Sequence, residues 1–427
     1  MTAPTGPSGV RSRRAGTLAI RGGTPAVRRT LDFGKGLSLA DDVEKRALVD
    51  VLESKALLRH TGSKVAAFER AFAEHLGVRF ALACSSGTAA LEIALAALGV
   101  GPGDEVIVPA VTFIACVAAV AAQGAHPVIC DVDDFMTLDP AAVRARLSPR
   151  TKAIMAVHLY GVACEMDALR AAATASGAAL MEDAAQACGA RANGSWLGTL
   201  GRIGAFSFQP GKMITCGEGG AIVTDDEALY DRAARFHDHG QQFPVLFGDA
   251  RPPRAGAPFV GRNFRLSEFA GALLGCQLTR LDGIVANTSR VRRAIEAGLA
   301  DLPLQVLQGE RTCDSTGVAI RLPTRDKAAR FMFALRAEGV PCGRLYEGKP
   351  VYATEPVLKG LTAVRSSAFA SELTTAPERP PYFMGMCPRA EDLVARTVGI
   401  VVGPLYSDED VEDIVVAVQK VADALQL

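Results

Sequence analysis

The stretch RFALACSSGTAALEIALAALGV, residues 79–100, sets the pattern on which the fold depends. A short apolar run ends at Cys84, the polar turn SSGT follows, and residues 89–100 have helical character. The scheme recurs as DEVIVPA before IACVAAVAAQG, HPVICDV before DPAAVRARL, and TKAIMAVHLYG before MDALRAAATASG. Strands that alternate with helices at this spacing predict βαβ units, with a largely parallel sheet covered by helices on both faces.

Length and charge narrow the possible functions. A chain of 427 residues exceeds one ordinary core, so we expect two domains. Lys+Arg and Asp+Glu both number 46, which gives no net positive field to attract nucleic acid or an anionic membrane. No apolar run approaches the roughly 20 residues of a membrane-spanning helix. We therefore expect neither nucleic acid nor membrane as a partner.

The cysteines and histidines do not predict a metal site. The ten cysteines are scattered without a C-x-x-C pair, and most lie in apolar contexts such as Cys116 in FIACVAAV. Buried free thiols are typical of a reducing compartment, so we expect a cytoplasmic location. His237 and His239 flank an aspartate at a predicted helix end, with no further ligand cluster nearby. We expect no metal ion.

The chain divides into three parts in this interpretation. Residues 1–30 lack the apolar stretch of a secretory signal and are expected to form a flexible tail. Residues 266–302 are expected to form one long helix that carries the boundary between a large domain, 31–285, and a small α+β domain, 286–427. Ser407 and Asp410 predict a capping box for the last helix. Residues 354–392 contain several prolines and predict no regular element.

A proline-, glycine- and arginine-rich segment, residues 241–262, interrupts the large domain. A loop of this length inside a compact domain is usually functional or ordered by a partner.

One lysine, Lys212, stands in FQPGKMITCGEGG, residues 208–220, between the predicted strands 203–209 and 220–226. It could be a solvated surface lysine, a phosphate-binding lysine or a covalent nucleophile. A phosphate-binding P-loop needs G-x-x-x-x-G-K-[ST], but Phe206 stands at the first glycine position and Met213 follows the lysine. The covalent alternative agrees better with the rest of the chain.

Pyridoxal phosphate needs a lysine, a carboxylate beside its ring nitrogen, and backbone N–H groups for its phosphate. Gly87 and Thr88 open a helix directly after a strand, and are either such a phosphate site or an ordinary turn. Asp183 follows the apolar run AALM at a strand's carboxyl end, where it pairs with the ring or caps a helix. Gln186 could reach the phenolic oxygen, and Phe113 could stack on the ring or belong to the core.

Ser207 completes the candidate phosphate site only if the chain turns back. It lies five residues before Lys212, which in an extended chain is about 17 Å. The glycines at 211, 217, 219 and 220 permit the turn that would bring both residues to one cofactor.

Together these segments resemble the sugar and cyclitol aminotransferases of the DegT/StrS type, pyridoxal-phosphate enzymes of fold type I. The resemblance runs from about residue 58 to the C-terminus, over four-fifths of the chain. Its most specific part is EDAAQACGA (182–190) followed by LGTLGRIGAFSFQPGKMITCGEGG (197–220), in the family's order and spacing. GPGDEVIVPAVTFIA (101–115), VHLYG (157–161) and GRNFRLSE (261–268) also resemble family segments.

The resemblance implies a fold and a set of roles. The large domain would have an aspartate-aminotransferase-like fold with a mixed, mostly parallel sheet. Lys212 would bind the cofactor covalently, Asp183 would pair with the ring nitrogen, and Gln186 with the phenolic oxygen. Phe113 would cover one face of the ring. The phosphate would be held by Ser207, Gly87 and Thr88, and by Asn263 of a second subunit, so that the enzyme would be a homodimer with shared active sites.

The implied activity is that of a transaminase acting on a ketone. The amino donor would be glutamine or glutamate, and the acceptor a keto-cyclitol or a keto-sugar, with a free cyclitol preferred in a secondary-metabolite pathway. Arg344 and Tyr346 are candidates for substrate contact, or pack within the small domain. Cys188 stands where the family often has histidine, and Glu268 to Ala272 departs from a family motif; both affect the substrate more than the reaction.

Three other functions stay open. One is a nucleotide-linked keto-sugar aminotransferase. Another is a different pyridoxal-phosphate reaction on this fold, such as dehydration or aromatisation, although Lys212 argues against a dehydratase, where histidine replaces the lysine. The third is a non-catalytic regulatory or binding protein, against which the complete set of cofactor residues argues.

Overall fold

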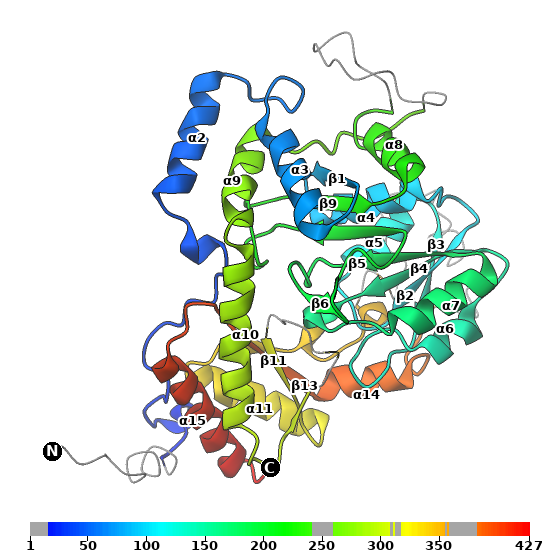
Figure 1. The fold of residues 1–427 in the computed structure, drawn as a ribbon. Coiled ribbons are helices and arrows are strands. Elements are labelled where there is room, and N and C mark those ends of the chain that lie inside the picture. Colours follow the sequence, from blue (N-terminus) through cyan, green and yellow to red (C-terminus); the bar gives the residue numbers. More distant parts are fainter. Residues whose placement is uncertain (1–15, 241–258, 308–310, 312–316, 355–356, 358–381) are drawn as a thin grey trace.

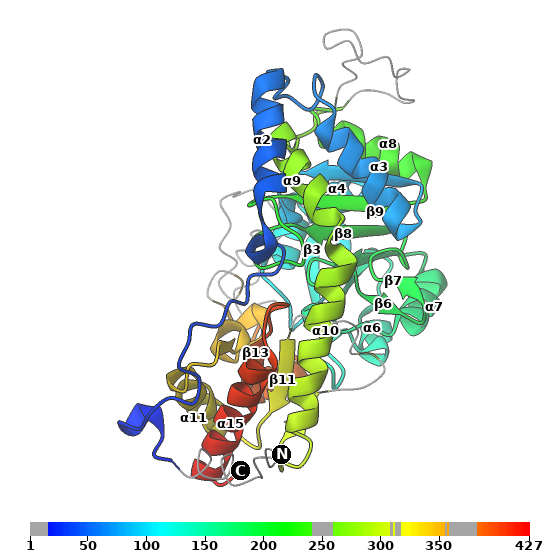
Figure 2. The same ribbon diagram turned by 60° about the vertical axis from the view of Figure 1, so that its left-hand side comes forward.

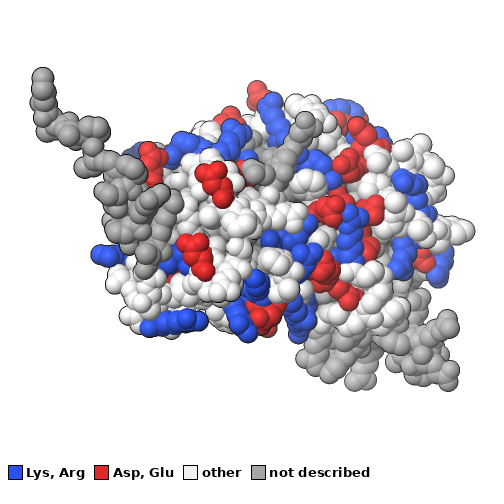
Figure 3. All heavy atoms as spheres, turned by 90° about the horizontal axis from the view of Figure 1, so that it is seen from below, with Lys and Arg blue, Asp and Glu red and all other residues white. Residues whose placement is uncertain are grey.

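The computed structural model of the protein describes residues 16–240, 259–307, 311, 317–354, 357 and 382–427. A large body is built on a seven-stranded sheet, and a smaller body on a four-stranded sheet (Figure 1). Among the helices that these residues form, none combines the length and apolar character that a membrane crossing requires. Basic and acidic side chains lie interspersed over the face seen from below (Figure 3).

The large sheet is mixed and mostly parallel, as predicted. Only β9 runs against its neighbours β1 and β8, and the other neighbouring strands pair in parallel. In spatial order its strands are β1 (Phe80–Cys84), β9 (Gly220–Thr224), β8 (Ile203–Ser207), β5 (Ala179–Asp183), β4 (Thr151–Val157), β2 (Glu105–Pro109) and β3 (His126–Cys130).

Helices cover both faces of this sheet, because its strands are apolar on both sides. Along β1 the side chains alternate, so that Leu82 joins a core with α4, α5 and α8, whereas Ala83 joins a core with α3 and α9. A further core lies under α6 and α7. The helices are α2 (Asp42–Ser54), α3 (Lys64–Leu76), α4 (Gly87–Ala97), α5 (Ala115–Ala122), α6 (Pro140–Arg146), α7 (Met166–Ser176), α8 (Glu227–Phe236) and α9 (Glu268–Leu278).

The smaller body is α+β, also as predicted. Its antiparallel sheet has the order β10 (Gln305–Val306), β11 (Gly317–Arg321), β13 (Thr397–Val401) and β12 (Cys342–Gly343). Three helices pack here: α11 (Arg325–Ala337), α14 (Pro388–Arg396) and α15 (Asp408–Ala424). The capping box predicted for the last helix is present, with Ser407 and Asp410 each accepting from the other's backbone N–H. Short elements are β6 (Arg191–Ala192), β7 (Ser195–Trp196) and the 3-10 turns Ala19–Arg21, Leu37–Leu39, Leu159–Gly161, Leu345–Glu347 and Val351–Ala353.

The single helix predicted over residues 266–302 is wrong. The chain forms α9 and then α10 (Leu281–Gly298), with a break at Thr279 and Arg280. The Thr279 hydroxyl donates 2.7 Å to the carbonyl of Cys276, a local bond that competes with regular helix. Val285 of α10 packs in the core of the large body, whereas Val291, further along the same helix, packs in the core of the small body. This change supports a boundary near residue 285, which we keep as a proposal.

The flexible tail predicted for residues 1–30 is wrong over residues 16–30. Leu18 and Val27 are buried in the core of the small body, and their segment runs beside α15 (Figure 2). The N–H groups of Ala19 and Ala26 donate 2.8 Å and 2.9 Å to the carboxylate of Glu338. Since these backbone groups find partners, the segment is ordered. Residues 1–15, 241–258 and most of 354–392 lie outside the described residues.

Candidate active site

The carboxyl ends of the parallel strands gather most of the predicted site residues. Asp183 is the last residue of β5 and is paired in register with Ala205 of β8, two positions before Ser207. Phe113 follows β2 in the turn that leads to α5. Because parallel strands end at one edge of a sheet, the order of the chain brings these residues to one place.

The segment around Lys212 turns back on itself, as its glycines predicted. The Lys212 N–H donates 2.9 Å to the Gln209 carbonyl, and the carbonyl of Phe208 accepts from Cys216 N–H at 3.1 Å and from the Thr215 hydroxyl at 2.8 Å. The turned loop therefore holds the Lys212 side chain at the edge of the large sheet where its parallel strands end. Burial lowers its pKa, and the negative charge of Asp183 partly opposes that shift.

Gly87 and Ser207 meet at the N-terminus of α4. A Cβ added to Gly87 would lie 2.6 Å from Cβ of Ser207, which no ordinary contact allows, so only glycine fits. The Ser86 side chain caps the helix by accepting from Ala89 N–H. This cap leaves the N–H groups of Gly87 and Thr88 without a partner among the described residues, beside the Ser207 side chain. Two such donors at a helix N-terminus suit a phosphate.

Two uncharged hydrogen-bond donors position the side chain of Asp183, which does not cap a helix. Its Oδ1 accepts from Ala185 N–H at 3.0 Å, and its Oδ2 accepts from the Cys116 thiol at 3.1 Å. Turns and not a helix follow it, so the capping alternative fails. Gln186 accepts from Tyr160 N–H at 2.9 Å through Oε1. Both side chains thus lie at the strand edge near Lys212.

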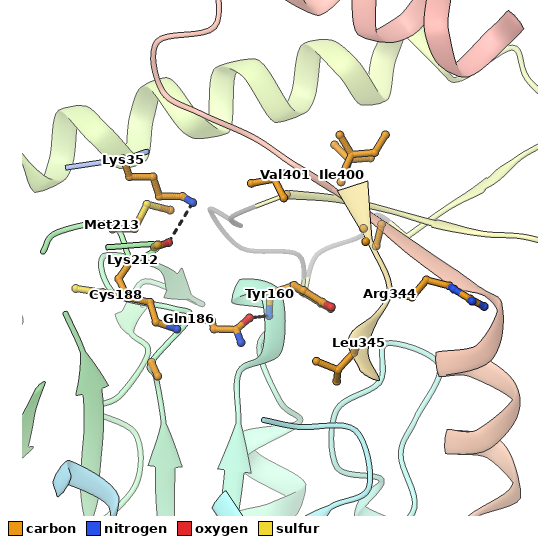
Figure 4. A pocket seen from close by; sticks show the side chains of 17 residues that line it. Lys35, Tyr160, Gln186, Cys188, Lys212, Met213, Arg344, Leu345, Ile400 and Val401 are labelled. Carbon is orange, nitrogen blue, oxygen red and sulfur yellow. Dashed lines mark hydrogen bonds between the residues drawn. The ribbon is translucent and has the colours of Figure 1, made fainter. Parts of the chain in front are cut away.

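Three further predicted residues, Phe113, Tyr346 and Arg344, differ in exposure and orientation. Phe113 is 56% exposed, so the alternative that it belongs to the core is wrong. Tyr346 reaches from the small body, and its hydroxyl accepts from Ile114 N–H at 2.6 Å. Arg344 points away from Lys212 (Figure 4) and donates 3.2 Å to the Ala395 carbonyl. The guanidinium of Arg344 therefore packs within the small body.

Asn263 lies in a segment that runs against the end of β1, where the Ser85 N–H donates 2.8 Å to the carbonyl of Phe264. Asn263 is exposed, forms an isolated bridge with Asp238, and accepts from Arg265 N–H at 3.4 Å through Oδ1. A role across a subunit interface stays a prediction.

A cavity of about 330 Å³ adjoins Lys212 and lies between the two bodies (Figure 4). Lys212, Gln186, Tyr160 and Cys188 line it from the large body. Cys188, the departure from the family motif, therefore borders this pocket. The opposite wall, from the small body, consists of small and aliphatic residues together with Arg344: Gly317, Val318, Ala319, Gly343, Arg344, Leu345, Gly399, Ile400 and Val401.

Two lining residues were missed by the sequence interpretation. Lys35 enters the cavity from the segment before α2, and Tyr160 from the turn after β4. Tyr160 has φ 54°, a left-handed conformation that is uncommon for a bulky side chain and often marks a functional turn. The signals in the sequence were weak: a lysine between two glycines in DFGKGLS, and a tyrosine in VHLYG.

The residues at this edge fit pyridoxal phosphate. Gly87, Thr88 and Ser207 would hold its phosphate, Asp183 would pair with its ring nitrogen, and Lys212 would supply the amine that its aldehyde needs. Phe113, exposed beside them, offers an apolar surface for the ring.

This fold and this site together define a pyridoxal-phosphate-dependent aminotransferase with an aspartate-aminotransferase-like fold. The model of the DegT/DnrJ/EryC1/StrS aminotransferase family matches residues 39–375. The chain belongs to that family.

Individual relatives agree with this assignment. An L-glutamine:2-deoxy-scyllo-inosose aminotransferase of Streptomyces paromomycinus is 37% identical over 426 residues, covering 95% of this chain and 97% of that protein. A 3-amino-5-hydroxybenzoate synthase of Amycolatopsis mediterranei (strain S699) is 46% identical over 247 residues, 58% of this chain and 62% of that relative, less than two thirds of its length. The crystal structure of a 3-amino-5-hydroxybenzoic acid synthase has a TM-score of 0.78 and 31% identity, covering 94% of this chain and all of that one.

Proposed function

We propose that the enzyme transfers an amino group from glutamine or glutamate to a ketone on a free cyclitol. The observation that carries this proposal is the pocket wall opposite Lys212, which is formed largely by glycine, alanine and aliphatic residues. The one arginine in the lining, Arg344, points away and donates to Ala395. A diphosphate would need basic side chains on this wall, whereas the ring of a cyclitol, which carries no charge, suits an apolar one; Lys35 and Lys212 lie elsewhere in the lining. Similarity along 95% of the chain to an inosose aminotransferase supports the same acceptor class.

Each residue of the site has a defined task in this proposal. When bound, pyridoxal phosphate supplies an aldehyde that accepts the amino group and a ring that withdraws electrons. Asp183 keeps the ring nitrogen protonated, and Gly87, Thr88 and Ser207 orient the phosphate. The lowered pKa of Lys212, caused first by burial, makes its free amine a suitable base for the proton on the donor's Cα. Release of the keto acid and the same steps in reverse would aminate the acceptor.

The remaining alternatives are less well supported. For a nucleotide-linked sugar acceptor, the wall contributed by the small body offers no lysine, and its arginine, Arg344, points away from Lys212. Dehydration is disfavoured because Lys212 is present, and a non-catalytic role is disfavoured because the cofactor residues converge at one strand edge. Aromatisation stays open as a second activity, since a relative at 46% identity bears the name of an aminohydroxybenzoate synthase.

We also propose a homodimer in which Asn263 reaches the phosphate of the partner's site. Asn263 is exposed, and so is the neighbouring Val260, at 95%. These two exposed side chains are available to a second copy. Of the nine cysteines that the structure describes, all are free and seven are buried, which supports our expectation of a reducing cytoplasm.

The test is a screen of the acceptor half-reaction. The protein in its amino-loaded form would be mixed with keto-cyclitols and keto-nucleotide-sugars while the visible absorbance of the lysine-bound cofactor is followed. We expect fast return of the band with a keto-cyclitol. Fast return with a nucleotide sugar and none with any cyclitol would overturn the proposed acceptor.

The control for this screen is Lys212→Ala, which should give no lysine-bound band. Borohydride reduction of the wild type and peptide mapping should place the modification on Lys212. A modified lysine elsewhere, or none, would contradict the assignment.

A further inference from the structure

Lys35 is a second amine in the cavity that holds Lys212. Its residue is only 3% exposed, and its Nζ points toward the Lys212 loop (Figure 4). There it donates one long hydrogen bond, 3.4 Å, to the carbonyl of Gly211, the residue before Lys212. The two lysines therefore lie side by side on the same wall of the pocket.

The chain holds Lys35 in this place through the residue that follows it. Gly36 N–H donates 3.0 Å to the Met213 carbonyl, and the Gly36 carbonyl accepts from Gln277 Nε2 at 3.0 Å. A Cβ on Gly36 would lie 1.8 Å from Gln277 Oε1, so only glycine allows so close an approach. The segment is thus fixed on both sides to the Lys212 loop and to α9. A lysine anchored in this way is not a freely moving surface side chain.

The ammonium group of Lys35 has no carboxylate partner among the described residues. Its uncharged neighbours in the lining include Gln186, Tyr160 and Cys188, while Lys212 and Arg344 are further bases. Burial, and then the charge of Lys212, lower the pKa of Lys35 to about 8. A buried ammonium without a counter-charge is costly, and an anion placed in the cavity would relieve that cost. The positive charge of Lys35 in the pocket thus has no balancing negative charge among the described residues.

We propose that Lys35 binds the α-carboxylate of the amino donor. This inference rests on the proposed amino-transfer function. Every amino-acid donor carries an α-carboxylate on the same carbon as the amino group that must reach the Lys212 position, and Lys35 lines the same cavity with its Nζ against the residue before Lys212. A keto-cyclitol carries no charge, so the same lysine has no anion to bind in the second half-reaction. Lys35 is accordingly a specificity residue for the donor.

The test pairs protein variants with ligand variants. Lys35→Met keeps an unbranched apolar side chain, one atom shorter, and removes the charge, and Lys35→Gln serves if the methionine variant fails to fold. Lys45→Met, on the exposed surface of α2, is the matched control, because Lys45 is 78% exposed. The probes are α-methylglutamine, which has no α-proton to lose and cannot turn over, and its α-carboxamide analogue. Binding is read from the absorbance change of the cofactor at equilibrium.

We expect Lys35→Met to weaken α-methylglutamine by about 10- to 100-fold, as loss of a charged hydrogen-bond partner does. The α-carboxamide analogue should bind both proteins equally, since it lacks the carboxylate. The rate of the acceptor half-reaction with a keto-cyclitol should change little. Lys45→Met should match the wild type in all three measurements.

Contrary outcomes are distinguishable. If no amino donor reacts with the wild type, the proposed function fails and this inference with it. If the wild type reacts and Lys35→Met or Lys35→Gln binds α-methylglutamine equally well, the inference alone is overturned. A loss confined to the acceptor half-reaction with a nucleotide sugar would assign Lys35 to a diphosphate, and would also overturn it.

Discussion

The thiol of Cys116 donates a hydrogen bond of 3.1 Å to Oδ2 of Asp183 at the edge of the large sheet. Burial raises the pKa of Cys116 well above its usual range, and the charge of Asp183 adds to that shift, so the thiol stays protonated and can donate. The other oxygen of Asp183 accepts from Ala185 N–H. Two neutral donors therefore orient the carboxylate, which suits the proposed role of Asp183 beside the ring nitrogen of the cofactor.

We predict that Asp183 contributes to turnover through the negative charge of its side chain and not through the shape of that side chain. Asp183→Asn keeps the size of the side chain but removes the charge that holds the ring proton, so turnover should fall by about 100-fold or more. Cys116→Ala removes only one neutral hydrogen bond and should cost about 10-fold or less. Steady-state rates and circular dichroism of both variants check this. Normal turnover by the asparagine variant would refute the assignment.

A second prediction concerns the cradle at the start of α4. Gly87→Ala would place a methyl group 2.6 Å from Cβ of Ser207, inside the proposed phosphate site. We expect the dissociation constant of pyridoxal phosphate to rise by about 10-fold or more, as one lost charged hydrogen bond would cause. Gly101→Ala is the control, because a Cβ there meets no atom within 4 Å. Equal affinities in the two variants would remove Gly87 from the site.

The sequence predicted those residues of the site that a local pattern marks, and not those that contacts with distant residues position. Asp183 ends an apolar run, and the strand pattern alone placed it at the carboxyl edge of the sheet. Ser207 lay inside the predicted strand 203–209, and the sequence placed it near Lys212 only if the glycine-containing loop turned back, whereas in the structure it ends β8. The predicted helix breaks at Thr279 and Arg280, where the Thr279 hydroxyl donates to the Cys276 carbonyl, a local bond that periodicity does not reveal. Residue propensity and spacing thus predicted which helices and strands form better than they predicted where each of them ends.

Lys35 and the N-terminal segment were missed for a different reason. Their positions depend on contacts with residues more than 170 positions away, such as Gly211 for Lys35 and Glu338 for Ala19. No local pattern in the sequence carries that information. A basic, glycine-containing N-terminus looks like a solvated tail until its partners are known.

Glu338 provides a third prediction, on stability. Its carboxylate is fully buried and accepts from the N–H groups of Ala19 and Ala26 and, at 2.9 Å, from the buried ammonium of Lys420. Glu338→Gln would leave the Lys420 charge uncompensated, which should reduce the free energy of unfolding by about 3–5 kcal/mol.

Urea denaturation measures this effect, with Glu409→Gln as control. Glu409 pairs with Arg29 on the surface and is 67% exposed, so its loss should change the free energy of unfolding by less than about 1 kcal/mol. Similar unfolding midpoints for the two variants would contradict the role given to Glu338.

The proposed shared site gives a fourth prediction. Lys212→Ala lacks the nucleophile, and Asn263→Asp would place a carboxylate against the partner's phosphate, so each variant alone should be inactive. Mixed and re-associated, they should form hybrid dimers with one intact site, restoring about a quarter of wild-type activity. Absence of recovery in hybrids isolated by two affinity tags would count against shared sites.

The last prediction is the pH dependence of donor binding. The pKa of Lys35 is lowered to about 8, so the ammonium is present below that pH and is lost above it. Since a carboxylate ligand needs the charged form, the affinity for α-methylglutamine should fall as the pH rises through 8.

Of the other titratable groups in the lining, burial raises the pKa of Tyr160, and that of Cys188 to about 12, so both stay neutral there. Arg344 keeps its charge and points away. Burial lowers the pKa of Lys212 too, but Lys212 is present in all the variants compared, so its contribution is common to them. In Lys35→Arg the guanidinium stays charged, and the decline should move to higher pH; in Lys35→Met the affinity should already be low and the step near pH 8 absent. Titrations of the three proteins between pH 6.5 and about 9.5, spanning the lysine range, would measure this. A step near pH 8 that persists in Lys35→Met would assign the titration to another group.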